Sequence, residues 1–232
     1  MFSAVNRKYE LALKRVKRNG LALKNIKKKD QTEEMCLMAV RQNEEALQYV
    51  KNQTEEMCLV AVSKNAWAFR HVKEQTEAIC LSAVKQRGDA LQLVENQTEE
   101  MCLIAVRSQN KDICVRSSED VYNIIWNPNL EYVKNQTKEI CLEAVKVDRY
   151  TLLHVRDQTE EICVAAAKRD YRALHYVRDQ TPEICLAAIE DFWIDGPKLR
   201  QASNLIRDLE MREQLVTYVM NRRFMKTKSA KK

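Results

Sequence analysis

Apolar and polar positions follow one pattern that recurs along most of the chain. Residues 53–62 read Q-T-E-E-M-C-L-V-A-V, and nearly the same ten residues begin again at Gln31, Gln75, Gln97, Gln136, Gln158 and Gln180. In each motif the apolar positions lie three, four, five, seven and eight residues after the Thr, which places them on one wide face of an α-helix. The residue six after the Thr varies freely (Met38, Val60, Ser82, Ile104, Glu143, Ala165, Ala187), so we expect it to point outward.

The Thr of each motif has the chemistry of a helix start. Its hydroxyl can accept a hydrogen bond from the free amides of the first turn, and the Glu residues that follow suit the positive end of the helix dipole. Pro182 follows Thr181 directly, and the first helical position is where a proline is tolerated best. We therefore predict a helix that begins after each Thr. We expect the Gln before each Thr to bond backbone groups of the turn, because stacked turns otherwise leave donors and acceptors unpaired.

A second helix is expected in each unit, opened by Asn43, Asn65, Asp148 and Asp170 and, less clearly, by the segment 87–89. Its apolar signature is A-L-x-x-V, as in residues 46–50. Two helices of about eight to ten residues are marginal alone, so stacking must stabilise them. Alanine seven residues after each Thr (Ala39, Ala61, Ala83, Ala105, Ala144, Ala166, Ala188) would let neighbouring helices approach closely.

The spacing of the motifs predicts a solenoid. Successive Thr markers are separated by 22, 22, 22, 39, 22 and 22 residues. The interval of 39 divides into two if S-E-D-V-Y-N-I-I-W, residues 118–126, is a disguised unit in which Tyr122, Ile125 and Trp126 replace the usual Cys, Ala and Val. A fixed short period is typical of stacked repeats.

We therefore predict an all-α fold, an α-solenoid of about nine short αα-hairpin repeats with a 22-residue period, capped at both ends. Residues 1–30 form a basic N-terminal cap with a partial repeat, and residues 31–190 form the array, with an irregular unit at 108–135. Residues 191–220 form C-terminal capping helices after the helix-breaking run 192–197, and 221–232 form a basic tail. Neighbouring helices about 8 to 10 Å apart would give an elongated, curved body.

Charge is segregated along the chain. Residues 1–30 carry ten Lys and Arg against two acids, and residues 221–232 carry six with no acid, although the formal net charge is only +6. The body between them is therefore acidic. With three Gly, three Pro and no apolar run near the ~18 residues of a membrane span, we expect a cytoplasmic helical protein without membrane partners.

The repeated string Q-T-E-E-[IM]-C-L-x-A-V, followed by x-A-L-x-Y-V-K-N-Q-T, resembles the tandem repeats of the "domain of unknown function 4116" family of large DNA viruses of amoebae. The resemblance covers roughly residues 31 to 190. It implies a viral origin and a helical repeat fold, and it carries no established activity. It would place the protein in the host cell cytoplasm or in the virion.

Seven of the eight cysteines occupy one apolar position of the motif (Cys36, Cys58, Cys80, Cys102, Cys141, Cys163, Cys185). No C-x-x-C pair starts a zinc site, and stacked repeats would hold equivalent atoms about 8 to 10 Å apart, beyond disulfide reach. We interpret these thiols as packing. Cys114 lies outside the pattern and is the one candidate for a reactive role. No metal or other cofactor is expected.

One column of residues is a candidate partner-binding ridge. The position five residues before the next Thr holds Tyr49, His71, Leu93, Tyr132, His154 and Tyr176. Tyr and His combine an apolar body with a polar tip and suit a protein interface, although half-buried packing explains the same pattern. The paired acids of the motif are explained by the helix dipole, and no nucleophile recurs beside them.

The basic ends are candidate phosphate contacts, through Lys27, Lys28, Lys29, Arg222, Arg223, Lys226 and Lys228. Solubilising tails have the same composition, and the acidic body would repel a duplex laid along it. The sequence thus favours a non-enzymatic protein-interaction scaffold or adaptor, and the resemblance to viral repeats implies that it is virus-encoded and acts in the host cytoplasm or the virion. The alternative is a nucleic-acid-associated protein anchored by its basic termini, and head-to-tail self-association is a third hypothesis.

Overall fold

The computed structural model describes residues 2–108, 128–190 and 196–229. The chain divides into two compact units, residues 1–108 and 109–232, and each is described by itself. All regular structure in the described ranges is helical, which confirms the predicted all-α repeat fold. The irregular segment 118–126 and Cys114 lie outside the described residues.

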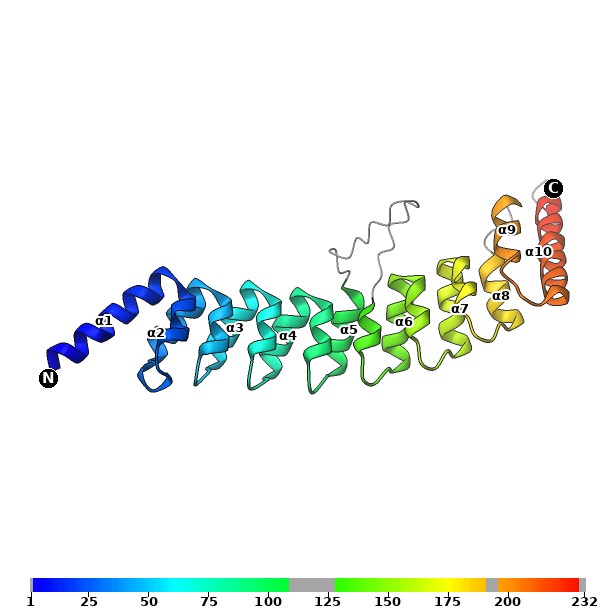
Figure 1. Cartoon of the computed structure of the whole chain (residues 1–232). Coiled ribbons are helices and arrows are strands. Elements are labelled where there is room, and N and C mark those ends of the chain that lie inside the picture. Colours follow the sequence, from blue (N-terminus) through cyan, green and yellow to red (C-terminus); the bar gives the residue numbers. More distant parts are fainter. Residues whose placement is uncertain (1, 109–127, 191–195, 230–232) are drawn as a thin grey trace. The chain divides into compact units, whose positions relative to one another are not determined.

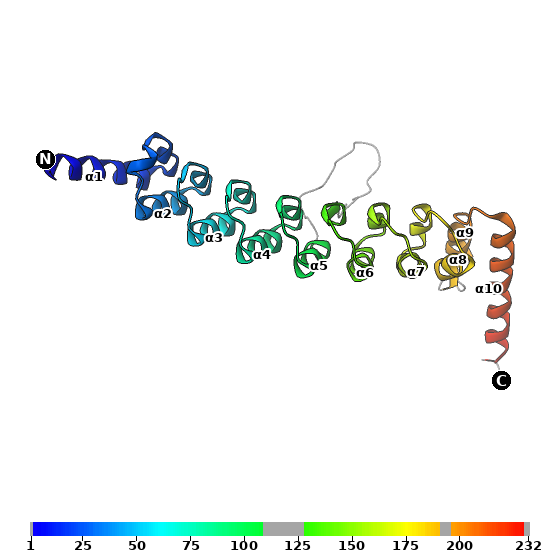
Figure 2. The ribbon, with the colours of Figure 1, turned by 90° about the horizontal axis from the view of Figure 1, so that it is seen from below.

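In unit 1 the elements are α1 (Phe2–Arg18), η1 (Gly20–Asn25), η2 (Lys28–Asp30), α2 (Glu33–Gln42), η3 (Glu44–Tyr49), α3 (Glu55–Lys64), η4 (Ala66–His71), α4 (Glu77–Gln86), η5 (Gly88–Leu93) and α5 (Glu99–Arg107), where η marks a 3-10 helix. In unit 2 they are η6 (Pro128–Tyr132), α6 (Lys138–Val147), η7 (Arg149–His154), α7 (Glu160–Arg169), η8 (Tyr171–His175), α8 (Pro182–Ile189), α9 (Gly196–Ser203) and α10 (Leu209–Ser229). Within each unit, the α-helices of the repeats (α2 to α5 and α6 to α8) lie side by side in one layer, and the 3-10 return limbs lie in a second (Figures 1 and 2).

The α-helices begin where the motif predicts. Thr54 is the N-cap of α3, and its Oγ1 accepts a hydrogen bond from the Met57 amide at 3.4 Å. The same cap occurs at Thr32, Thr76, Thr98, Thr137 and Thr181, with Pro182 in the first turn of α8. Thr159 has the extended backbone of a cap without the side-chain bond.

The return limb of each repeat is a 3-10 helix of five or six residues, shorter and more tightly wound than the second α-helix expected. Asn43 ends α2 through its own amide, which donates to the Ala39 carbonyl, and begins η3 by accepting from the Glu45 amide through its side chain. Only six residues then separate it from Val50. The larger rise per residue, about 2.0 Å against 1.5 Å, lets so short a limb run further beside its α-helix.

Four of the motif's apolar positions form the core. Residues three, four, seven and eight after each Thr are at most 4% exposed, as at Met57, Cys58, Ala61 and Val62. The residue five after each Thr was expected to be buried and the residue six after it to point outward. Both are half-buried in the described repeats, except Ala187, which is buried. At 100° per residue these two positions flank the outward direction of the helix on opposite sides, so each is partly covered.

The recurring glutamine ties each repeat to the next. The Gln53 carboxamide donates to the carbonyls of Leu47 at 3.1 Å and His71 at 2.8 Å, and it accepts from the Lys73 amide at 3.0 Å. Gln136, Gln158 and Gln180 make the same set of three bonds, and Gln31 and Gln75 make both contacts with the following turn. This confirms the expectation that the glutamine bonds the backbone of the turns.

Residues on either side of the repeats make contacts like those within the repeats. Asn19 caps η1, and Gly20 lies so close to α2 that an added Cβ would meet the Ala39 carbonyl oxygen. At the other end, Gln180 bonds Leu205 and Arg207 as if α9 were another return limb. The last helix, α10, contacts α8 and continues to Ser229, so the segment separated as a basic tail begins inside a helix.

Candidate partner-binding surface

The seven cysteines of the motif are buried and free. Burial raises the pKa of the Cys58, Cys163 and Cys185 thiols to about 11, and the charge of Glu55 contributes at Cys58. The Sγ atoms of six of these cysteines lie 3.7 to 3.9 Å from the Oε1 atom of the glutamine in the same motif, as with Cys58 and Gln53. Protonated, enclosed thiols of this kind fill space and make poor nucleophiles.

The residues within the described ranges contain no group of three His, Cys, Asp or Glu side chains that could hold a metal ion. None of the helices in those ranges is long and apolar enough to cross a membrane.

In each unit the predicted ridge positions are half-buried side chains on the 3-10 layer: Tyr49, His71 and Leu93 in unit 1, and Tyr132, His154 and Tyr176 in unit 2. Backbone carbonyls at this position accept the glutamine bonds described above. His71 Nε2 lies 3.1 Å from Glu45 Oε2, which belongs to the preceding repeat. Although burial opposes ionisation, hydrogen bonds from His71 and Arg70 lower the pKa of Glu45. The ridge side chains therefore present only one edge to solvent.

The residue just before each ridge position is exposed and was missed by sequence reasoning. These outward positions hold Gln48, Arg70 and Gln92 in unit 1 and Glu131, Leu153 and His175 in unit 2. Leu153 is an apolar side chain 46% exposed. The signal was present in the alignment of the repeats, because this column changes chemistry at every step, whereas the column just before it holds Leu in every repeat except for Phe69.

Aromatic and arginine side chains form a cluster on η7 and at the end of η8. The Tyr150 and Tyr176 rings lie 5.3 Å apart, and the Arg149 guanidinium lies 4.3 Å from the Tyr150 centroid. Arg149 also pairs with Asp170 at 2.9 Å. Burial raises the pKa of Tyr176, and the neighbouring Tyr150 adds to the shift. Tyr and Arg are enriched in protein interfaces.

Basic side chains at the turns bridge repeats. Lys73 Nζ donates to the carbonyls of Val50 and Lys51 in the preceding turn, at 2.8 and 2.7 Å. Arg156, Arg178 and Arg207 each donate to two carbonyls of the turn before them. This column of cations therefore stabilises the stack as well as contributing charge.

The paired acids at the helix starts bridge repeats too. Glu55 Oε1 accepts from the Thr76 hydroxyl at 2.6 Å, and Glu56 pairs with Arg41 at 2.9 Å. Exposed pairs of this kind contribute little stability each. Their contacts are with caps and cations of neighbouring repeats.

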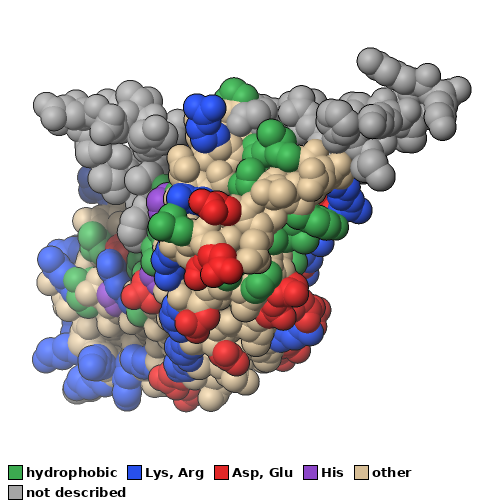
Figure 3. Space-filling view, turned by 90° about the vertical axis from the view of Figure 1, so that its right-hand side faces the viewer, with side chains coloured by type: hydrophobic (Ala, Val, Ile, Leu, Met, Phe, Trp, Pro, Cys, Tyr) green, Lys and Arg blue, Asp and Glu red, His purple; other side chains and the backbone are tan. Residues whose placement is uncertain are grey.

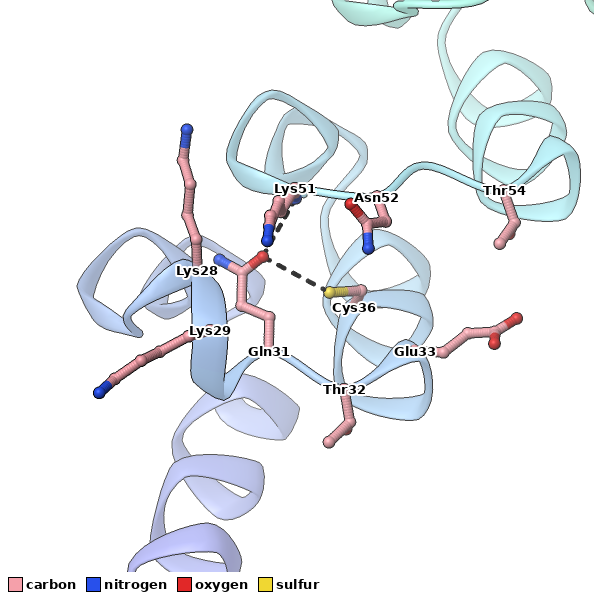
Figure 4. Close-up of a pocket in the computed structure, with 9 residues that line it drawn as sticks. All are labelled: Lys28, Lys29, Gln31, Thr32, Glu33, Cys36, Lys51, Asn52 and Thr54. Atoms are coloured by element: carbon pink, nitrogen blue, oxygen red, sulfur yellow. Dashed lines mark hydrogen bonds between the residues drawn. The ribbon is translucent and has the colours of Figure 1, made fainter.

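A hollow of about 260 Å³ opens between the first two turns of unit 1 (Figure 4). Its walls are Lys28, Lys29, Gln31, Thr32, Glu33, Cys36, Lys51, Asn52 and Thr54. Gln31 crosses its floor, where its Oε1 accepts from the Lys51 amide at 3.1 Å. The Lys28 and Lys29 side chains rise from the rim and extend into solvent.

The predicted phosphate contacts are divided between the two ends. Lys27, Lys28 and Lys29 are exposed around η2. Arg222 of α10 forms an ion pair with Glu190, so its guanidinium already has an acidic partner. Arg223, Lys226 and Lys228 belong to α10, but their side chains lie outside the described residues. Of these residues, the described structure places Lys28 and Lys29 in the lining of a hollow.

Apolar side chains lie exposed at the C-terminal end of unit 2, among charged ones (Figure 3). Leu209, Tyr218 and Met220 of α10 are 62%, 49% and 46% exposed, whereas Val219 between them is buried. The helix thus packs one side on α8 and leaves a partly apolar side uncovered.

No protein-family model matches the chain. Neither the curated proteins nor the solved structures contain a match.

Proposed function

We propose that the protein is a non-enzymatic scaffold or adaptor that binds other proteins through the outward side of its 3-10 layer. One observation carries the proposal. The residues that the repeats share are used in caps, core and glutamine bonds, whereas the exposed column changes from amide to guanidinium, carboxylate, aliphatic and imidazole groups. In an extended solenoid binding surface, the residues that the repeats share hold the fold, and the exposed residues that vary can contact the partner.

The repeat motif adds an origin to this proposal. Its resemblance to repeats of large DNA viruses supports a virus-encoded protein that acts in the host cytoplasm or is carried in the virion. The proposal assigns binding alone, because the paired acids and thiols of the motif already have structural roles in the described repeats.

A comparison of two matched variants tests the scaffold function. The first replaces Arg70, Leu153 and His175 by Ala on the 3-10 layer, and the second replaces Glu34, Lys85 and Lys168 by Ala on exposed positions of the α layer. Both are used with the wild-type chain to capture proteins from cells that produce it. We expect specific partners to be lost with the first variant and kept with the second.

The proposal fails if the wild-type chain enriches no protein above a control matrix, or if both variants keep the same partners. Equal circular dichroism and unfolding midpoints for the variants exclude loss of folding as the cause.

Association with nucleic acid is the second candidate, and the cationic hollow beside Lys28 and Lys29 favours it. Binding that weakens steeply as salt rises would support it. Indifference to DNA and RNA at low salt would remove it.

A further inference from the structure

The hollow of unit 1 has a counterpart in unit 2 at the same place in the repeat. It has a volume of about 270 Å³ and is lined by Lys134, Asn135, Gln136, Lys138, Cys141, Arg156, Asp157, Thr159 and Ile162. Gln136 and Cys141 take the places of Gln31 and Cys36, and Arg156 takes the place of Lys51. Two hollows in one register make this a property of the repeat geometry.

Both hollows are cationic to the same degree. The lining of the first hollow holds Lys28, Lys29 and Lys51 with one carboxylate, that of Glu33, while Asp30 lies outside the lining and pairs with Lys8. The lining in unit 2 holds Lys134, Lys138 and Arg156, also with one carboxylate, that of Asp157.

Equivalent positions elsewhere in the array do not share this charge. The equivalent positions around Gln75 hold one cation, Lys73, and three acids, Glu74, Glu77 and Glu95, so that register is acidic in composition. The positions around Gln53 hold two lysines and two acids, and those around Gln158 hold two arginines and three acids. The motif therefore does not require a cationic surround.

Lys138 breaks the motif in the unit 2 hollow. It is the first residue of α6, where α2, α3, α4, α5 and α7 begin with Glu. A cation is unfavourable at the positive end of a helix, and departures from a local rule tend to mark functional positions. Its ammonium pairs with Glu161 of the next helix, an exposed contact that an incoming anion can replace.

The lining supplies donors for an anion. Thr32 and Thr54 carry hydroxyl groups at the first hollow, and Asn52 carries an amide between them (Figure 4). The Lys28 and Lys29 ammonium groups stand on flexible stems that can turn inward. A volume near 260 Å³ is below the range of drug-sized sites, about 300 to 1,000 Å³, and suits one small charged group.

We propose that these two hollows are phosphate-binding sites, each taking one phosphate group from a small phosphate compound or from a nucleic-acid backbone. The inference is independent of the scaffold function and stands or falls on different residues.

Titration of the ¹⁵N-labelled full chain with inorganic phosphate at constant ionic strength tests it. The proposal predicts saturable shifts of the Gln31 and Gln136 side-chain amides and of the Thr32 and Thr137 backbone amides. The Gln75 and Thr76 signals serve as an internal control, because that register has the same fold and an acidic surround.

A triple variant, Lys28→Gln, Lys29→Gln and Lys51→Gln, tests the site in unit 1 alone. These side chains are exposed, so the fold is expected to persist, and an unchanged melting temperature verifies it. Phosphate affinity at the Gln31 register should fall by at least about tenfold while the Gln136 register is unaffected.

A second titration, with a short single-stranded oligonucleotide, identifies the source of the phosphate group. Shifts at both registers that exceed those with inorganic phosphate at equal phosphate concentration, and that weaken steeply with salt, identify nucleic acid. Shifts with inorganic phosphate alone identify a small phosphate compound. Equal shifts at the Gln75 register, no saturation with either ligand, or full binding by the triple variant would overturn the proposal.

Discussion

Replacing Gln53 by Ala removes one complete inter-repeat connection. Its carboxamide makes three bonds to backbone groups, at 3.1, 2.8 and 3.0 Å, and two of the three partners belong to the following turn. A hydrogen bond contributes about 1 kcal/mol net, so the substitution should cost about 3 kcal/mol. The side chain is half-buried, and water that reaches the freed groups would lower that cost toward about 2 kcal/mol.

Guanidinium unfolding followed by circular dichroism measures the cost, with Gln48→Ala as the matched control. Gln48 is exposed and bonds only Glu45 in its own 3-10 helix, so its loss should change the free energy of unfolding by less than about 0.5 kcal/mol. Gln53→Glu adds a pH signature. The carboxylate would face two carbonyls, so its pKa rises on folding, and this variant should gain stability as pH falls and lose it as pH rises.

The reasoning is refuted if Gln53→Ala and Gln48→Ala have the same unfolding midpoint and slope. It is also refuted if the free energy of unfolding of Gln53→Glu depends on pH in the same way as that of the wild type between about pH 4 and about pH 8. An ordinary or raised carboxyl pKa lies within that range.

Four further substitutions test the caps, the buried thiols and the ion pairs of the repeats. Thr54→Ala should cost about 1 kcal/mol because it removes the cap of α3, and Thr159→Ala should cost less because that Thr lacks the side-chain bond; equal losses in chemical unfolding would contradict the cap assignment. Burial raises the pKa of Cys58 from 9.0 to about 11, so deprotonation favours the unfolded chain and stability should fall as pH rises from 9.0 to about 11. Cys58→Ala should make that fall shallower, and an unchanged slope would show that the thiol is not enclosed. Although burial opposes ionisation, hydrogen bonds from Arg172 lower the pKa of Asp170 below 3.8. The ionised carboxylate therefore stabilises the fold above pH 3.8, and this stabilisation is lost as the pH falls further. Asp170→Asn should therefore make the fall of the melting temperature at acid pH less steep.

The helix starts and the buried positions could be predicted from the sequence because the same motif recurs several times. Thr before Glu identifies a helix start by chemistry, and the recurrence of Cys58 and its equivalents at one apolar position indicates packing. The glutamine was expected to bond backbone groups, but its partners could not be named. Gln53 contacts residues 18 and 20 positions later, and only the stacked turns bring those groups together.

Other features depend on geometry that residue order does not specify. A-L-x-x-V spacing is compatible with an α-helix and with a 3-10 helix, so the short limb from Asn43 to Val50 was assigned the commoner form. The ridge column was aligned correctly, yet the exposed position beside it, as at Leu153, follows from how the 3-10 helix is turned. The hollow beside Lys51 lies between two successive turns, so one motif taken alone does not predict it.

Hydrogen exchange at the turn amides tests most directly whether the glutamines hold the repeats together. The amides of Lys73, Arg156 and Arg178 lie in exposed turns and bond to the glutamine Oε1 of the preceding repeat, at 2.9 to 3.0 Å. They should exchange slowly in the native chain, and Gln53→Ala should release Lys73 while Arg156 and Arg178 keep their protection. Exchange of all three at the rate of an ordinary solvated loop, or no change at Lys73 in the variant, would contradict the account.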